Sequence, residues 1–139
     1  MKKTIVKILS LVLISCSLFS VAALADENTV AYEIYISNPI TVSADSSQWS
    51  FRSPYWLLAT PDFEQGYCNA WANVNGTWYY IDKDGHLIEN HIIKDTQTGK
   101  DYYAKEDGSL LINGYYTNYY DNQTKYYAGS DGALTPVNN

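Results

Sequence analysis

Aromatic rings are the side chains whose type and spacing recur in this sequence. Trp78-Tyr79-Tyr80 stand just before an Asp-Gly pair, and tandem tyrosines return at Tyr102-Tyr103 and Tyr126-Tyr127. Such rings offer flat faces that stack on one another and on ligands, and tyrosine adds a hydroxyl at the rim. The pattern favours aromatic stacking, and most of these rings are expected to build the scaffold.

Groups that support catalysis or metal binding are sparse. His86 directly follows a predicted turn, and His91 has no cysteine or second histidine at a metal-ligand spacing. Asp82-Lys83-Asp84-Gly85 resembles part of a calcium loop but fits a turn better, because the glutamate at the twelfth position is missing. No nucleophile elbow, P-loop or dinucleotide motif occurs. We therefore predict a protein that is not an enzyme and needs no cofactor.

The tandem tyrosines belong to a pattern that occurs three times. Residues 79–87, 102–110 and 126–134 share Y-Y-[IA]-x-x-D-G-x-L. The glycines of the three copies are 23 and 24 residues apart. Five matching positions at nearly constant spacing indicate an array of like units.

Each unit predicts a β-hairpin whose turn centres on the Asp-Gly pair. In the first unit, Asp82 suits the first position of a type I turn, and Gly85 supplies the left-handed residue that closes it. Side chains alternate along a strand, so Trp78 and Tyr80 share one face. A lone hairpin is marginally stable, so the units must stack. The predicted fold class is all-β, with tandem hairpins over residues 70–139 stacking as a short β-solenoid.

Residues 26–69 predict a small β-rich region of unknown role. Val30–Ile36 and Ile40–Val42 are rich in strand-forming residues. Tyr55-Trp56-Leu57 lies 24 residues before Tyr79-Tyr80-Ile81, which suggests a divergent fourth unit without the Asp-Gly turn.

Residues 1–25 predict a secretory signal peptide. Three lysines precede an apolar run, and Ala23-Leu24-Ala25 forms a small-residue cleavage site before Asp26. The apolar run is too short and serine-rich for a membrane span. The alternative is a lipoprotein anchored through Cys16, which ends a lipobox-like sequence. Cleavage after Ala25 predicts a secreted or cell-wall-associated protein.

Cleavage after Ala25 changes the formal net charge from −6 to −9, because it removes three lysines and no acidic residue. An acidic exported domain lacks the basic surface that nucleic-acid binding needs. Cys68 is then the only cysteine, so no disulfide framework is expected and Cys68 is predicted to be a small buried residue.

The segment Ala70–Leu87 resembles the repeats of choline-binding and glucan-binding cell-wall proteins. Its sequence AWANVNGTWYYIDKDGHL follows the family pattern G-W-x-x-x-x-G-x-W-Y-Y-[LF]-x-x-x-G-x-M closely. The later units, up to residue 134, depart from the pattern. Asp101 and Lys125 replace the first ring of the triplet, and His91 lies where the next tryptophan falls.

The resemblance implies a left-handed solenoid with ligands held between consecutive hairpins against aromatic rings. It implies Trp71, Trp78 and Tyr80 as ligand-binding residues, with Tyr103 of the next hairpin closing the site. The alternative role of these four rings is to stack on one another inside the protein and bind no ligand. The implied partner is a wall or surface polysaccharide or a choline-bearing polymer, and the rim hydroxyls of tyrosine favour the polysaccharide. The alternative function is a secreted scaffold that binds other proteins.

Overall fold

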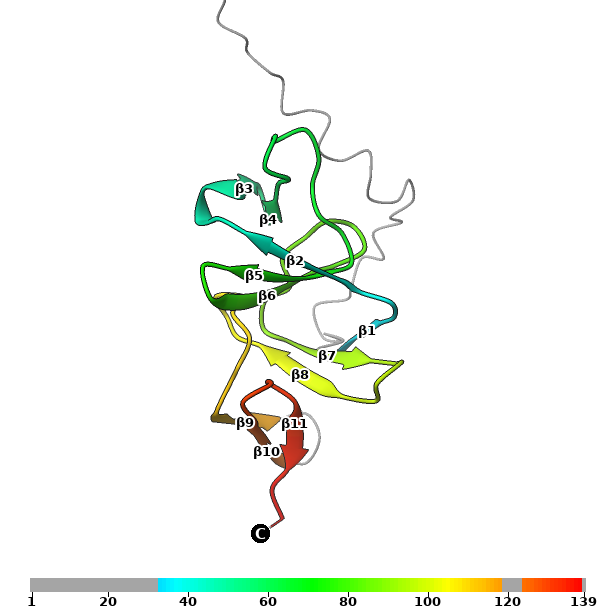
Figure 1. The fold of residues 1–139 in the computed structure, drawn as a ribbon. Coiled ribbons are helices and arrows are strands. Elements are labelled where there is room, and N and C mark those ends of the chain that lie inside the picture. The colour runs from blue at the N-terminus through cyan, green and yellow to red at the C-terminus, as the bar shows by residue number, and fades with distance from the viewer. Residues whose placement is uncertain (1–32, 119–123, 139) are drawn as a thin grey trace, which may run out of the picture.

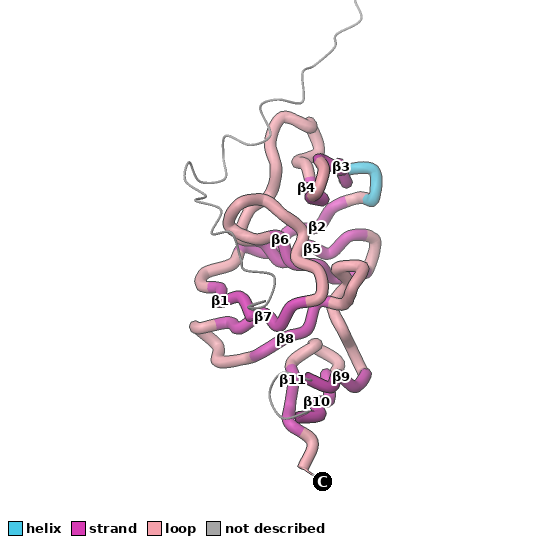
Figure 2. The backbone as a smooth tube through the Cα atoms, turned by 180° about the vertical axis from the view of Figure 1, so that it is seen from behind, coloured by secondary structure: helices cyan, strands magenta, loops and turns pink. Residues whose placement is uncertain are grey.

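The computed structural model describes residues 33–118 and 124–138, so the predicted signal peptide and Cys16 lie outside the described residues. These residues form eleven strands and one short 3₁₀ turn, Ser46–Gln48. The 3₁₀ turn is the cyan segment near the top of Figure 2. The strands are β1 (Glu33–Ile36), β2 (Ile40–Ala44), β3 (Trp49–Arg52), β4 (Tyr55–Leu58), β5 (Ala70–Val74), β6 (Thr77–Ile81), β7 (His91–Asp95), β8 (Asp101–Ala104), β9 (Gly114–Asn118), β10 (Thr124–Ala128) and β11 (Leu134–Pro136).

Four antiparallel hairpins follow one another along the long axis of the molecule. They are β3–β4, β5–β6, β7–β8 and β9–β10, from top to bottom in Figure 1. The last three lie within residues 70–139, as predicted, and the all-β class of tandem stacked hairpins is confirmed. The uppermost hairpin is formed by residues 49–58, which the sequence suggested only as a divergent unit.

The hairpin turns differ from the expectation. In β5–β6 the strands are joined at Asn75 and Gly76, not at the Asp-Gly pair, because Val74 pairs with Thr77. Both turn residues have positive φ, 50° and 89°, which matches the twist of a two-residue hairpin. The prediction that each hairpin turn centres on Asp-Gly was therefore wrong for this unit.

The first two Asp-Gly pairs instead form corners that carry the chain from one hairpin to the next. The third pair, Asp131-Gly132, does connect two antiparallel strands, β10 and β11, as predicted, and β11 completes the sheet β11-β10-β9. The local geometry is as expected: Gly85 has φ 85°, and its N–H donates to the Asp82 carbonyl. After this corner a single bridge pairs Ile81 with Leu87. The Leu87 N–H then donates to the Trp56 carbonyl of the hairpin above, at 2.8 Å. Leu110 does the same to Trp78, so each corner ties two hairpins together.

The N-terminal strands pair with the hairpins in parallel. Strand β1 lies beside β7 and strand β2 beside β5, which gives the sheet orders β1-β7-β8 and β2-β5-β6. These strands cover hairpin edges that would otherwise expose unpaired N–H and C=O groups. The strands expected within Val30–Ile36 and Ile40–Val42 are present where the chain is described, and they extend two of the hairpins.

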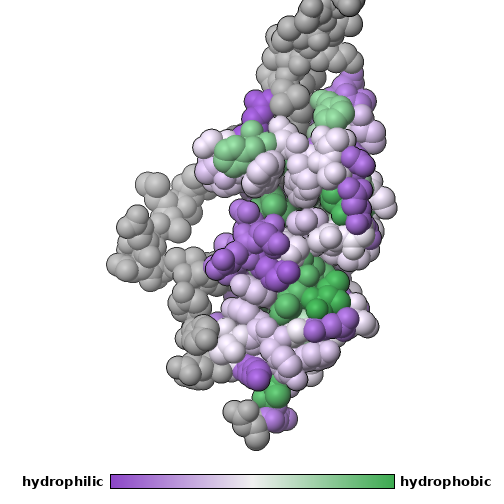
Figure 3. Space-filling model, turned by 90° about the vertical axis from the view of Figure 1, so that its left-hand side faces the viewer, coloured by the Kyte–Doolittle hydropathy of each residue, from purple (hydrophilic) through white to green (hydrophobic). Residues whose placement is uncertain are grey.

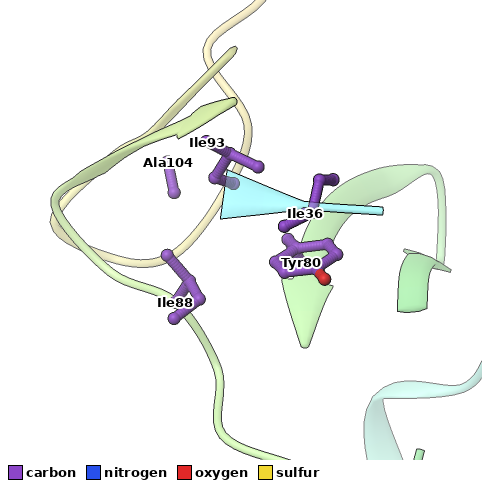
Figure 4. Packing of buried hydrophobic residues seen from close by; sticks show 5 residues of the cluster. All are labelled: Ile36, Tyr80, Ile88, Ile93 and Ala104. Carbon is purple, nitrogen blue, oxygen red and sulfur yellow. The ribbon is translucent and has the colours of Figure 1, made fainter. Parts of the chain in front are cut away.

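Buried side chains form two clusters between neighbouring hairpins. One contains Ile36, Tyr80, Ile88, Ile93 and Ala104, and Figure 4 shows Ile36 of β1 lying against the Tyr80 ring. The other is built around Leu58 and Ile81, with small residues of β5 beside them. Each cluster draws on at least two hairpins, so burial of apolar surface depends on stacking.

Cys68 differs from the expectation in its burial. Its side chain is half-buried, whereas a fully buried residue was predicted.

The variant Gly108→Ala is expected to destabilise the stack by about 2–4 kcal/mol, from a strained left-handed residue and a crowded contact. Gly108 has φ 80°, and a Cβ there would lie 2.7 Å from a methyl carbon of Leu87 in the preceding corner. Gly99→Ala is the matched control, because Gly99 has φ 69° but no atom within 4 Å of the added carbon. Thermal unfolding of both variants separates strain from crowding, and equal losses would show that the Leu87 contact has no effect.

Candidate functional site

A cavity of about 210 Å³ lies between hairpins β5–β6 and β7–β8. We call it the lower pocket. Trp71 and Trp78 of the upper hairpin and Tyr102 of the lower one supply its rings, and Leu110 and Ile112 supply aliphatic surface. The remaining lining residues are Thr41, Ser130 and Asp131. Two of the four residues predicted to bind ligand are therefore brought together here.

Strand register places these rings. Trp71 of β5 lies directly opposite Tyr80 of β6, and residues directly opposite each other point to the same face of a sheet. Trp78, two residues before Tyr80, shares that face. The Trp71 ring centre is 5.0 Å from that of Tyr80 and 5.0 Å from that of Tyr102. Trp71 is thus held between its own hairpin and the next.

The carboxylate of the lower pocket is neutralised by a lysine. The Lys100 ammonium lies 3.0 Å from the Asp131 carboxylate, and both side chains are at least half exposed. The N–H of Ala133 and the Lys100 ammonium hold the pKa of Asp131 below its ordinary value. Asp131 therefore stays ionised at neutral pH, and the ion pair leaves little net charge at the rim.

The other two predicted ligand residues lie elsewhere. Tyr80 is only 2% exposed, and its hydroxyl donates to the Asn69 side chain at 2.6 Å. Tyr103 stacks on Tyr116 of the hairpin below, with ring centres 4.0 Å apart. The ring that closes the pocket is Tyr102, one residue earlier, because neighbouring residues of a strand point to opposite faces. Tyr80 supports Trp71 from the core.

Removal of the Tyr80 hydroxyl is expected to lower the free energy of unfolding by about 1–2 kcal/mol, because a buried partner loses its hydrogen bond. Tyr103→Phe is the matched control for Tyr80→Phe. The Tyr103 hydroxyl donates to Asn90 at 2.8 Å in the same register, but that bond is exposed. Denaturant unfolding should show a clearly smaller loss for Tyr103→Phe. A larger loss for Tyr103→Phe contradicts the placement of Tyr80 in the core.

A second cavity, the upper pocket, repeats this arrangement one hairpin higher. It has a volume of about 560 Å³ and lies between β3–β4 and β5–β6. Trp49 and Trp56 come from the upper hairpin, and Tyr79 and Leu87 come from the unit below. The other lining residues are Ser46, Glu89 and Asp107. The Trp49 and Tyr79 ring centres are 5.1 Å apart and nearly perpendicular, at 76°.

The isolated β-bridges that follow hairpins β3–β4 and β5–β6 show that the two pockets are equivalent. Ala59 pairs with Gly66 as Ile81 pairs with Leu87, so residue 59 corresponds to residue 81. Trp56 then corresponds to Trp78, an offset of 22 residues and not the 24 suggested by the sequence. The seven-residue spacing of Trp49 and Trp56 equals that of Trp71 and Trp78, and this signal in the sequence was missed.

Below the lower pocket the tryptophans are replaced. Ile92, which lies opposite Tyr103 as Trp71 lies opposite Tyr80, is 4% exposed. Asp101 takes the place of Trp78 and lies 3.8 Å from the Lys94 ammonium. In the last hairpin the ammonium of Lys125 lies 4.4 Å from the centre of the Tyr115 ring. Within the described residues, paired tryptophans line only the two upper positions of the stack.

Over residues 33–118 and 124–138, no group of three or more His, Cys, Asp or Glu side chains is placed to hold a metal ion. The same residues contain no helix that is long and apolar enough to cross a membrane. On one side of the stack a compact hydrophobic patch lies among hydrophilic residues (Figure 3).

Solved structures with the same fold are choline-binding and endolysin chains. The Cpl-1 endolysin complexed with a peptidoglycan analogue is 26% identical, with a TM-score of 0.53 over 70% of this chain and 25% of its own. The pneumococcal cell wall endolysin from phage Cp-1 complexed with choline is 26% identical, with a TM-score of 0.52 over 63% of this chain and 24% of its own. This chain thus spans about a quarter of those proteins.

A choline binding domain shares the fold over nearly its whole length. The choline binding domain of Spr1274 from Streptococcus pneumoniae has a TM-score of 0.52 and 24% identity, over 63% of this chain and 93% of that domain. No curated protein matches the sequence significantly.

Stacked hairpins with aromatic pockets between them define the class as a β-hairpin repeat protein. Residues 69–87 match the family described as a cell wall binding repeat. The resemblance to choline-binding repeats is confirmed by this match and by the structures that share the fold.

Proposed function

We propose that this chain is a secreted, non-enzymatic protein that attaches to bacterial cell wall by holding choline groups of a wall polymer in the lower pocket. The observation that carries the proposal is the convergence of Trp71, Trp78 and Tyr102 from two successive hairpins on one small cavity. Such rings attract a quaternary ammonium by cation–π interaction, at about 0.5–2 kcal/mol per good contact.

The size of the lower pocket supports a small headgroup. Cavities that hold drug-sized ligands measure roughly 300–1,000 Å³, whereas the lower pocket measures about 210 Å³. A trimethylammonium group has no N–H to donate, so it needs ring faces and aliphatic contacts more than acceptors. The lining of Trp71, Trp78, Tyr102, Leu110 and Ile112 offers those contacts.

A solved structure with the same fold supports a choline ligand. The pneumococcal endolysin of phage Cp-1 was solved in complex with choline, and its matching region shares this fold at 26% identity. Repeats of this kind bind weakly one at a time and gain strength when several engage one polymer. The two equivalent pockets of this chain suit such a polymer.

A wall polysaccharide is a second candidate, favoured by exposed rings outside the pockets. Phe51 is 54% exposed and Tyr115 is 62% exposed, so part of each ring is accessible to sugar rings. A scaffold that binds other proteins is the remaining alternative.

The proposed secretion depends on residues 1–25 acting as a signal peptide. The secreted product is therefore expected to begin at Asp26. Its intact mass checks this expectation. A mass that includes a diacylated Cys16 contradicts cleavage after Ala25 and establishes the lipoprotein alternative.

The proposed function is tested by binding of the purified chain to isolated cell walls with free choline as the competitor. Release at millimolar choline is expected, because one such pocket holds free choline only weakly. Retention at high choline with release by soluble wall polysaccharide favours the second candidate. Failure to bind any wall fraction overturns wall attachment and favours the scaffold.

A further inference from the structure

The two pockets share their rings but differ in charge. Four lining positions are equivalent in the two pockets. In the upper pocket they are Trp49, Trp56, Tyr79 and Leu87, and in the lower pocket, in the same order, Trp71, Trp78, Tyr102 and Leu110. Where the lower pocket has Ile112, the upper pocket has Glu89, because both residues lie two positions after the corner leucine. Where the lower pocket has Asp131, the upper one has Asp107. The upper pocket is therefore an aromatic site with two carboxylates.

Neither pocket is lined by a described Lys, Arg or His side chain, so the cations near their carboxylates lie outside the pockets. Asp131 of the lower pocket is ion-paired with Lys100 at 3.0 Å. Near the upper pocket, Lys105 acts electrostatically on Asp107. The upper pocket therefore has two carboxylates, one of them partly offset by a lysine, whereas the single carboxylate of the lower pocket is ion-paired.

Asp107 is fixed in its charged form beside a ring of the pocket. Its Oδ1 accepts hydrogen bonds from the Ser109 hydroxyl at 2.6 Å and the Ser109 N–H at 2.9 Å. These bonds, and to a lesser extent the nearby Lys105 ammonium, lower the pKa of Asp107. Burial and the nearby Asp107 carboxylate raise the pKa of Tyr79. The Asp107 charge therefore acts on the same ring that helps to line the pocket.

Carboxylates beside aromatic rings discriminate between ammonium ions. A protonated primary amine donates up to three N–H groups, and charge-assisted hydrogen bonds to carboxylate are stronger than neutral ones. A quaternary ammonium has no N–H and gains only the long-range attraction and the ring contacts. The upper pocket, at about 560 Å³ against 210 Å³, also encloses three methyl groups less closely.

We propose that the upper pocket binds a protonated primary amine in preference to choline, through the rings of Trp49, Trp56 and Tyr79 and the carboxylates of Glu89 and Asp107. This proposal rests on the proposed function of the two pockets as sites for cations. The ligand class is a primary ammonium carried by the wall polymer, on either an amino sugar or an aminoacyl ester. The chain then binds two different cationic groups in successive pockets, a primary ammonium in the upper one and choline in the lower one.

Tryptophan fluorescence can observe each pocket separately, because the four tryptophans of the chain all line the two pockets. The double variant Trp71→Phe with Trp78→Phe leaves only the upper pocket fluorescent. The reverse pair, Trp49→Phe with Trp56→Phe, leaves only the lower pocket fluorescent. Phenylalanine keeps a ring at each position, and circular dichroism checks that both variants fold.

The two variants are titrated with ethanolamine and with choline, which differ only in three methyl groups. The upper pocket is expected to bind ethanolamine roughly fivefold more tightly than choline, the effect of about one exposed charge-assisted hydrogen bond. Glu89→Ile, which installs the residue type of the lower pocket, should remove most of that preference. Glucosamine and alanine methyl ester then distinguish the two sources of the amine.

Equal or tighter binding of choline in the upper pocket, or no binding of ethanolamine there, overturns the proposal. A preference for ethanolamine that survives both Glu89→Ile and Asp107→Asn also overturns the role of the carboxylates. Failure of the proposed function has a different signature, since it is the absence of choline binding in the lower pocket.

Discussion

Trp78→Ala is expected to weaken choline binding in the lower pocket roughly tenfold, because it removes one of three ring faces around the proposed cation site. Trp78 is half-buried and lines the pocket beside Trp71 and Tyr102. Isothermal calorimetry of the folded variant measures the change. Trp71→Ala is less informative, because Trp71 also packs against the core cluster around Tyr80 and its loss affects stability as well.

Lys125→Ala is the control for this variant, because Lys125 stands at the same register position in the last hairpin but outside the lower pocket. Its affinity for choline should equal that of the parent chain. If Trp78→Ala is folded and binds choline like the parent, the ring is structural and the scaffold alternative gains support.

Ile93→Ala is expected to cost about 2–5 kcal/mol of stability, the usual cost of truncating a fully buried isoleucine. Ile93 is 0% exposed and lies in the cluster that joins β1, β6 and the hairpin β7–β8. Domains of this size are stable by only about 5–15 kcal/mol, so a loss of this size shifts the thermal midpoint by many degrees.

Ile40→Ala provides the comparison, since Ile40 has the same side chain on a strand of the N-terminal region but is 53% exposed. Its effect should stay within about 0.5 kcal/mol, as for most surface substitutions. Urea unfolding of the two variants measures both values. Similar losses for Ile93→Ala and Ile40→Ala would contradict the described core.

Stacking explains why the pockets lie between hairpins and not within one. Hairpin β5–β6 turns Trp71 toward the unit below and Tyr79 toward the unit above. A pocket therefore needs two successive units with the right rings. The third position fails this requirement, because Ile92 and Asp101 replace the tryptophans.

The sequence by itself determined the local units. The repeated strand-forming segments within residues 70–139, the left-handed glycines of the corners and the strands at the N-terminal end all follow from short-range chemistry. Gly85 needs positive φ, and aromatic and β-branched residues favour extended backbone. The match of residues 69–87 to a known repeat follows from the same local pattern.

Only the tertiary structure decided which rings meet. A shift of one residue along a strand moves a side chain to the opposite face, so Tyr102 lies in the lower pocket while Tyr103 contacts the next hairpin down. The turn at Asn75-Gly76 competes with the Asp-Gly pair for the hairpin, and pairing across β5 and β6 decides between them. The parallel pairing of β1 with β7 joins residues almost sixty positions apart. No local pattern specifies such contacts, because they depend on how whole hairpins stack.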